Sequence, residues 1–196
     1  MVRHIKYSYT RPGEKRKHYL GPDDIDVLLG RLPENTYERL LAVHFNDRAW
    51  GRRYFGYVNR GHREIALCAL PPRVSLSSCF GRSNRRRVQG SPRRFGAVRG
   101  AQWPETAVRR FLLYNGFLHE LGHLQIVDPK ARNVWRRFAC ETKAQEFADR
   151  WRARLWSEPY EHPDPIHNPP SDVELELLEY ELRPQAELRP PSLAHC

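Results

Sequence analysis

The segment that most constrains the fold is PETAVRRFLLYNGFLHELGHLQIV, residues 104–127. It predicts one long helix that is apolar on nearly every side and stops before Pro129. A helix of this kind is buried in a protein core. Yet it carries His119, Glu120 and His123, and a buried carboxylate without a partner is costly. The fold therefore has to bring a partner to these polar side chains.

The five residues His-Glu-Leu-Gly-His have the spacing of a zinc site. His119 and His123 are four residues apart, so both imidazoles project from one helix face, about 40° apart around the axis. Glu120 lies about 60° from His123, beside a metal rather than on it, where it can deprotonate a zinc-activated water. Gly116 and Gly122 flank the histidine face and are expected to leave room for a metal and a substrate. The motif predicts two zinc ligands and a general base, whereas two ordinary buried histidines would leave the glutamate unexplained.

A catalytic zinc has three protein ligands and an open position, and a second helix, predicted over roughly residues 131–156, offers the third ligand. Glu141 falls in the middle of the apolar stripe of that helix, whereas Glu146 falls on its polar side. A carboxylate in a core-facing stripe requires a positive partner, and a metal ion provides one. Pairing with Arg137 is the main alternative, and Asp128 is a poorer ligand because the first helix ends there.

Small residues surround Glu141 on the second helix. Ala144 and Ala148 lie on the same side as Glu141 and would let this helix approach the HELGH helix closely. Gln145, about one turn after Glu141, is placed to hydrogen-bond to the ligands and orient them. We therefore expect Gln145 to support a site of two histidines and one glutamate.

A His-Glu-x-x-His motif followed by a helical glutamate resembles the gluzincin metallopeptidases. The stretch ETKAQEFA, residues 141–148, resembles the segment that follows this motif in the ImmA/IrrE-type bacterial metallopeptidases. The resemblance covers roughly residues 105–156 and implies that Glu141 is the third zinc ligand. The chain departs from that family at Gln145, where the family usually has Asn or Asp.

The resemblance also implies the zincin fold, in which the edge of an antiparallel sheet binds an extended peptide beside the motif helix. The metzincin class is excluded, because Ile126 and Pro129 stand where its extended motif has a glycine and a third histidine. We expect an α+β protein with a minimal zincin-like domain. A small antiparallel sheet of three to four strands would pack on the HExxH helix and on the glutamate-bearing helix. Runs bounded by turn residues predict the strands over residues 38–46, 53–59, 63–70 and 73–80.

We expect three parts: a basic N-terminal arm (residues 1–20), a zincin-like metallopeptidase domain (21–156) that opens with a short helix over 21–32, and an acidic Pro-rich tail (157–196). Residues 1–156 hold 31 Lys and Arg against 14 Asp and Glu, whereas residues 157–196 hold 2 against 9. The acidic part of the tail is expected either to cover the cleft of the basic body or to be solvated.

The Arg-rich loop 82–99 and the net charge of +10 favour anionic partners, nucleic acid among them. No run approaches the roughly 18 apolar residues of a membrane span, and we read no export signal, so no membrane partner is expected. The four cysteines are scattered without a CxxC pair. They are therefore interpreted as reduced thiols of a cytoplasmic protein.

These features predict a zinc metallopeptidase that cleaves a protein or peptide substrate, with Zn²⁺ as cofactor and Glu120 as the catalytic base. One alternative is a nucleic-acid-associated basic protein, of which a protease acting on DNA-bound protein is one form. Another is a zinc-binding regulator without hydrolytic activity. The donor that stabilises the oxyanion stays open, and four residues are candidates for it: Tyr114, Tyr160, His162 and His167.

Overall fold

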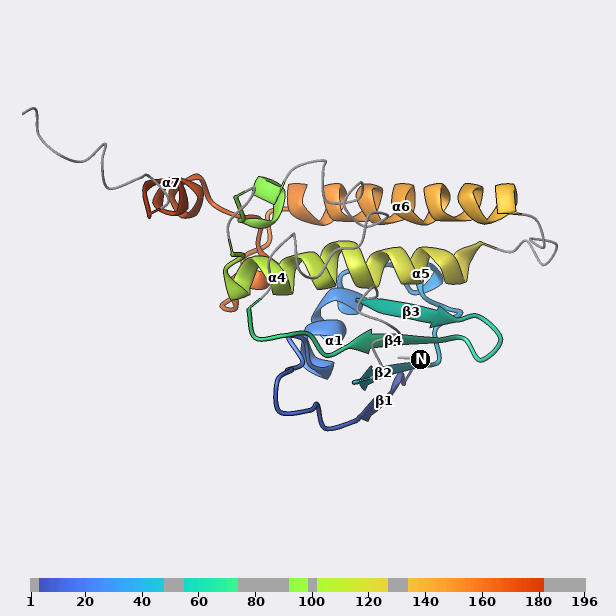
Figure 1. The fold of residues 1–196 in the computed structure, drawn as a ribbon. Helices are drawn as coiled ribbons and strands as arrows, with labels where there is room; N and C mark the ends of the chain where they lie inside the picture. The colour runs from blue at the N-terminus through green and yellow to red at the C-terminus, as the bar shows by residue number, and fades with distance from the viewer. Residues whose placement is uncertain (1–3, 48–54, 74–91, 99–101, 127–133, 182–196) are drawn as a thin grey trace, which may run out of the picture.

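The computed structural model describes residues 4–47, 55–73, 92–98, 102–126 and 134–181, which fold into three stacked layers. Helix α6 (Val134–Ser157) forms one outer layer, and helices α4 (Glu105–Phe111) and α5 (Leu118–Gln125) form the middle layer. A four-stranded sheet forms the third layer, so the middle helices lie between the sheet and α6 (Figure 1). This is an α+β architecture. None of the described helices is both long enough and apolar enough to cross a membrane.

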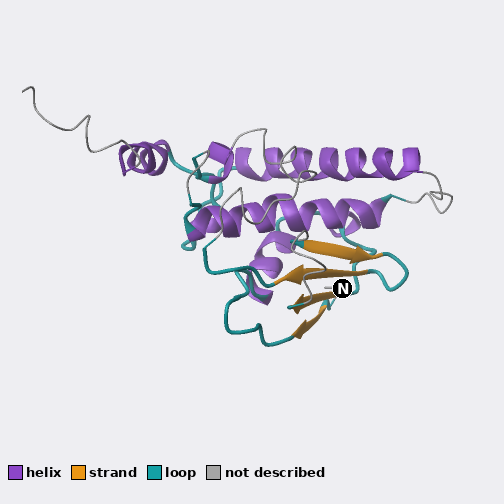
Figure 2. Ribbon diagram, viewed as in Figure 1, coloured by secondary structure: helices purple, strands orange, loops and turns teal. Residues whose placement is uncertain are grey.

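The sheet is mixed, which corrects the expected antiparallel sheet. Its strands are β1 (Lys6–Tyr9), β2 (Ala42–Asn46), β3 (Gly56–Asn59) and β4 (Glu64–Cys68), in the order β1-β2-β4-β3 (Figure 2). Strand β2 is parallel to both β1 and β4, and only β3 and β4 are antiparallel. A parallel pair needs a long crossover connection, and the segment between β1 and β2, which contains helix α1, provides one.

Strand β1 lies in the part of the chain that was expected to be a basic arm. Its side chains are mostly exposed. An exposed strand needs no alternation of apolar residues, which is the pattern that indicates a strand in a sequence. The expected strands over 38–46, 53–59 and 63–70 form as the shorter β2, β3 and β4. The expected strand over 73–80 lies almost wholly outside the described residues.

Helix α1 (Pro22–Gly30) confirms the short helix expected over residues 21–32. Pro22 stands in its first turn, and the Asp24 carboxylate accepts a hydrogen bond of 2.8 Å from the Gly21 backbone N–H. Ile25 and Leu28 are fully buried in the core that α1 shares with the sheet and the middle helices.

The expected long helix is interrupted by a π-helical segment, η4 (Leu112–Phe117), between α4 and α5. A π turn holds an extra residue, so α4 is rotated relative to α5 in a way that a regular helical wheel does not describe. The helix ends at Gln125, because Ile126 already has an extended backbone. This end is slightly earlier than the one expected before Pro129.

Helices α5 and α6 are in close contact at Gly122. A Cβ atom at Gly122 would lie 3.0 Å from the Cα of Ala144 and 3.1 Å from the Cβ of Phe147. Ala144 and Ala148 are fully buried, which confirms that small residues allow this approach. The expectation for Gly122 itself is corrected, because the glycine makes room for the α6 backbone rather than for a substrate. At Gly116 an added Cβ atom would meet only the Phe111 carbonyl oxygen, at the ordinary van der Waals distance of 3.9 Å.

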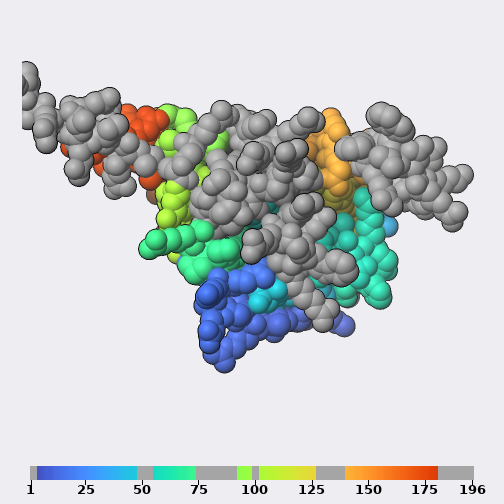
Figure 3. All heavy atoms as spheres, in the orientation of Figure 1, coloured from blue at the N-terminus to red at the C-terminus, as the bar shows by residue number. Residues whose placement is uncertain are grey.

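Part of the acidic tail forms helix α7 (Asp172–Glu181), and the Ser171 hydroxyl caps it by accepting a hydrogen bond from the Glu174 N–H. Glu174 binds the buried guanidinium of Arg110 on α4 at 2.7 Å, and Glu179 binds Arg93. Helix α7 therefore lies beside α4, at the opposite end of the middle layer from α5 (Figure 1). It projects at one corner of the space-filling view, away from the N-terminal strand (Figure 3). This placement does not support a tail that covers the HELGH motif.

The close contact between α5 and α6 predicts opposite effects for two Gly-to-Ala changes. We expect Gly122→Ala to lower the free energy of unfolding by about 1–3 kcal/mol, because the new methyl group would press on the α6 backbone. Gly116→Ala meets no such obstacle and should be neutral or stabilising, since alanine favours helix more than glycine does. Urea denaturation of both variants measures the difference, and equal stabilities would contradict the packing at Gly122.

Candidate metal centre

Two histidines of α5 and one glutamate of α6 converge at the seam between the two helices. The Nε2 atom of His119 lies 3.2 Å from Oε2 of Glu141, and Nε2 of His123 lies 3.3 Å from Oε1 of the same carboxylate. One ligand atom from each residue lies within 4.8 Å of the other two. Among the described residues this is the one group of three or more His, Cys, Asp or Glu side chains close enough to hold a metal ion.

The site combines buried imidazoles with a more open carboxylate. His119 and His123 are 1% and 5% exposed, whereas the side chain of Glu141 is 46% exposed. Glu146, the other glutamate of this part of α6, is exposed. The helical periodicity of α6 thus places Glu141 toward the histidines and Glu146 away from them, as expected. The alternative partner Arg137 lies in the part of α6 whose side chains are outside the described residues.

The donor set fits a first-row divalent cation. Two imidazole nitrogens and a carboxylate oxygen suit zinc, and the same donors also suit nickel, cobalt or iron. The two Nε2 atoms lie close to different oxygens of the one Glu141 carboxylate. The atoms that would bind a metal are therefore already directed at a common point.

Arg60, in the turn after β3, contacts one of these histidines and was not anticipated. Its Nη2 atom lies 3.0 Å from Nδ1 of His123. Because arginine only donates, this contact makes Nδ1 an acceptor and leaves the ring proton on Nε2, directed at Glu141. A metal bound at Nε2 would require the proton on Nδ1, so Arg60 would then turn away. It is exposed and can do so. No local sequence signal identifies Arg60, because the fold of the β3–β4 hairpin against α5 places it there.

Glu120, the expected general base, lies next to His119 and is partly buried. The negative charge of Glu120 acts on Cys68 of strand β4. Burial raises the pKa of the Cys68 thiol to about 11; the positive charge of Arg16 lowers it, and the negative charge of Glu120 raises it. Glu120 therefore lies within electrostatic reach of β4, directly after His119 and three residues before His123. The Cys68 thiol is buried and donates to Oδ1 of Asn46 at 3.7 Å.

Gln145 supports the site in a different way from the one expected. Its Nε2 atom donates to Oδ1 of Asn115 at 2.9 Å and to Oδ1 of Asp149 at 3.3 Å. Arg152, which is buried, contacts the same two oxygens. Asn115 belongs to the π-helical segment, about one turn before His119. Gln145 therefore joins α6 to η4, and its recorded hydrogen bonds do not include the three clustered side chains.

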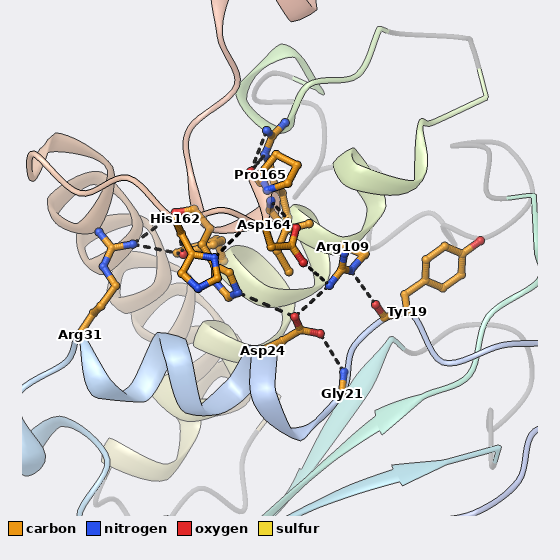
Figure 4. Close-up of polar contacts among 12 residues, drawn as sticks. Tyr19, Gly21, Asp24, Arg31, Arg109, His162, Asp164 and Pro165 are labelled. Atoms are coloured by element: carbon orange, nitrogen blue, oxygen red, sulfur yellow. Dashed lines mark hydrogen bonds and ion pairs between the residues drawn. The ribbon is translucent and has the colours of Figure 1, made fainter.

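The candidates for the oxyanion donor belong to a different polar cluster, of which Figure 4 labels His162. The Tyr114 hydroxyl is buried and donates to the His167 carbonyl at 3.2 Å. The rings of His162 and His167 contact each other, with centroids 4.5 Å apart. The Arg31 guanidinium stacks on the ring of Tyr160. Figure 4 shows the loop of His162 packed against α1 and α4, so these side chains hold the tail in place.

The centre of this polar cluster is Arg109 of α4. Its Nη2 atom lies 2.9 Å from both Asp24 of α1 and Asp164 of the tail (Figure 4). Arg93 and Arg94, at the end of the Arg-rich loop, also face acidic partners, since Arg93 pairs with Glu179 and Arg94 lies 3.9 Å from Asp149. Arg93 therefore has an acidic partner within the chain, and Arg94 lies near the outer limit of ion-pair distance from one. The arginines at 85–87 lie outside the described residues.

Comparison of the chain with models of protein families, with curated proteins and with solved structures finds no match. The assignment of the candidate metal centre therefore rests on the distances and the burial of its side chains.

The geometry of the seam predicts which glutamate affects metal binding. Removing a residue that only orients a ligand costs about 10- to 100-fold in metal affinity, so we expect Glu141→Ala to weaken zinc binding by at least 100-fold. Glu146→Ala is the matched control on the same helix and should leave zinc binding within twofold. Zinc content and competition with a chromophoric chelator measure both, and equal loss in the two variants would contradict the assignment.

His167 predicts a pH dependence of stability that does not involve the metal centre. Burial lowers its pKa to about 4, helped by the charge of His162, although Asp24 and Asp164 act in the opposite direction. In the unfolded chain His167 therefore binds a proton below about pH 6.5, whereas in the folded chain it binds one only below about pH 4. Stability should fall by up to about 3 kcal/mol as the pH drops through this window.

Urea denaturation at several pH values checks this dependence. His167→Gln should flatten the slope between pH 4 and 6.5, whereas His62→Gln, at an exposed turn, should leave it unchanged. A slope that His167→Gln does not alter would show that another group titrates.

Proposed function

We propose that this chain is a zinc metallopeptidase with a zincin-like domain. The observation that supports this best is the convergence of His119, His123 and Glu141 on one point, with Glu120 beside them on α5. The donor set, the burial of the imidazoles and the partial exposure of the carboxylate are the properties that a catalytic rather than a closed structural site requires. The resemblance to the gluzincin motif points to the same residues.

The proposed reaction assigns a separate role to each side chain. His119, His123 and Glu141 would hold the ion, and Zn²⁺ held there would supply a Lewis acid that acidifies water and polarises the scissile carbonyl. Glu120 would take the proton from the attacking water and deliver it to the nitrogen of the leaving amine. The α5–α6 contact at Gly122 keeps the carboxylate of α6 close to the imidazoles of α5.

The substrate would be a protein or peptide in an extended conformation. Strand β3 is an edge of the sheet and contacts α5, the helix of the motif. An extended peptide could add to this edge through backbone hydrogen bonds and pass the candidate centre. Arg60 follows β3 directly and contacts His123, so the end of this strand lies at the site.

We do not extend the proposal to nucleic acid. The described arginines of the Arg-rich loop, Arg93 and Arg94, face acidic side chains of the same chain. A zinc-binding regulator without hydrolytic activity is the remaining alternative. It shares the metal ligands with a peptidase and differs from it only in the role of Glu120.

The role of Glu120 is tested by Glu120→Gln, which keeps the size of the side chain and removes the base. We expect zinc content to stay at the wild-type level and peptide hydrolysis to fall by about 100-fold or more. Cleavage is measured on a broad peptide library by mass spectrometry. Glu146→Gln, the same chemical change at an exposed position of α6, should retain activity.

Three outcomes are informative. Retained zinc with lost cleavage supports the peptidase, and unchanged cleavage in Glu120→Gln overturns the role of this residue. A wild-type protein that binds zinc stoichiometrically and cleaves no member of the library is the result that a zinc-binding regulator predicts.

A further inference from the structure

A cavity of about 400 Å³ lies against the C-terminal half of α6, and none of the three clustered metal-ligand candidates lines it. Its volume is within the range of roughly 300–1,000 Å³ that small-molecule sites have. The walls come from three segments far apart in the sequence. They include Phe147, Arg150, Trp151 and Arg154 of α6, Gln125 at the end of α5, and Asn35 in the 3-10 turn η1 (Glu34–Thr36).

The walls of this cavity are rich in hydrogen-bond donors. Arg150 and Arg154 each contribute a guanidinium group, which only donates. The Nε1–H group of Trp151 and the Nε2 amide of Gln125 are buried and have no hydrogen-bond partner within the described part of the chain. A buried donor without an acceptor is destabilising. Both residues line the cavity, and a small side-chain movement that opened these groups to an acceptor there would satisfy them.

The negative charge needed to balance the two arginines is missing from the walls. Among the described residues that line the cavity, none is acidic. Glu158 approaches Arg154, with 3.7 Å between Oε1 and Nε, but both side chains are largely exposed. Such a surface pair is weak and readily exchanged. The cavity therefore presents positive charge that the described residues leave largely uncompensated.

The stacking of Arg150 and Arg154 on aromatic rings indicates which kind of ligand the cavity can bind. The Arg154 guanidinium lies over the ring of Trp151, 5.2 Å from its centroid, and that of Arg150 lies 5.8 Å from the centroid of Phe147. These guanidinium groups cover the ring faces on which a nucleobase would stack. Stacking leaves the N–H groups at the edge of each guanidinium available, in the fork geometry that matches two oxygens of one anion.

We propose that this cavity binds a small molecule through a compact oxyanion, a phosphoryl or carboxylate group held between Arg150 and Arg154. The indole N–H of Trp151 is a further donor to the same group. The site is independent of the proposed peptidase activity, because no metal ligand and no catalytic residue belongs to it. Binding there stabilises the junction of α6 with the end of α5 and with η1.

Isothermal titration calorimetry with inorganic phosphate and, separately, with succinate tests the proposal. The protein is kept in a chelator so that no metal ion binds the anion. We expect saturable binding of one equivalent of at least one probe. Arg150→Gln/Arg154→Gln should weaken this binding at least tenfold. The matched control Arg11→Gln/Lys143→Gln removes the same charge at exposed positions outside the cavity and should change the binding less than twofold.

The Trp151→Phe variant separates a built site from general electrostatic attraction. It keeps an aromatic ring and the net charge, so a severalfold loss of affinity supports an indole N–H that donates to the anion. Preference for phosphate assigns a phosphoryl ligand, and preference for succinate assigns a carboxylate ligand. Absence of saturable binding for both probes overturns the proposal, as does an equal loss in the double variant and in its charge-matched control.

Discussion

The candidate metal centre depends on the close approach of two helices that are joined by a segment outside the described residues. Gly122 on α5 has no side chain at the point where the Ala144 backbone of α6 passes. A larger residue at either position would separate the helices. Glu141 lies one turn before Ala144, so this contact brings its carboxylate within 3.3 Å of both imidazoles. The buried histidines thereby gain the acidic partner that their position in a core helix requires.

The remaining polar side chains of the middle layer fix the helices that carry the centre. Gln145 and Arg152 of α6 hold Asn115 of the π-helical segment, which fixes the start of α5. At the other end, Arg110 is almost fully buried and is neutralised by Glu174 of the tail. Arg109 joins α1, α4 and the tail in the same way. The polar groups of the middle layer thus include a set that can bind a metal, a set that joins η4 to α6 and a set that attaches the tail.

The site could be predicted from the sequence more completely than the sheet could. Helical periodicity relates residues that are close in the chain, so it identified His119, His123 and Glu141 and separated Glu141 from Glu146. The parallel pairing of β1 with β2 is a long-range property of a short, exposed strand, and no local pattern signals it. The contact of Arg60 with His123 joins residues of two separate elements. The π-helical segment also escaped prediction, because its residues are as apolar as those of a regular buried helix.

The central claim is that two imidazoles and a carboxylate, rather than thiols, hold a zinc ion. X-ray absorption at the zinc K-edge of the zinc-loaded protein reports the ligand atoms directly. The account predicts one zinc per chain surrounded only by nitrogen and oxygen at about 2.0–2.2 Å, with the multiple-scattering pattern of two imidazoles. A sulfur shell at about 2.3 Å, or a spectrum without imidazole scattering, would contradict it.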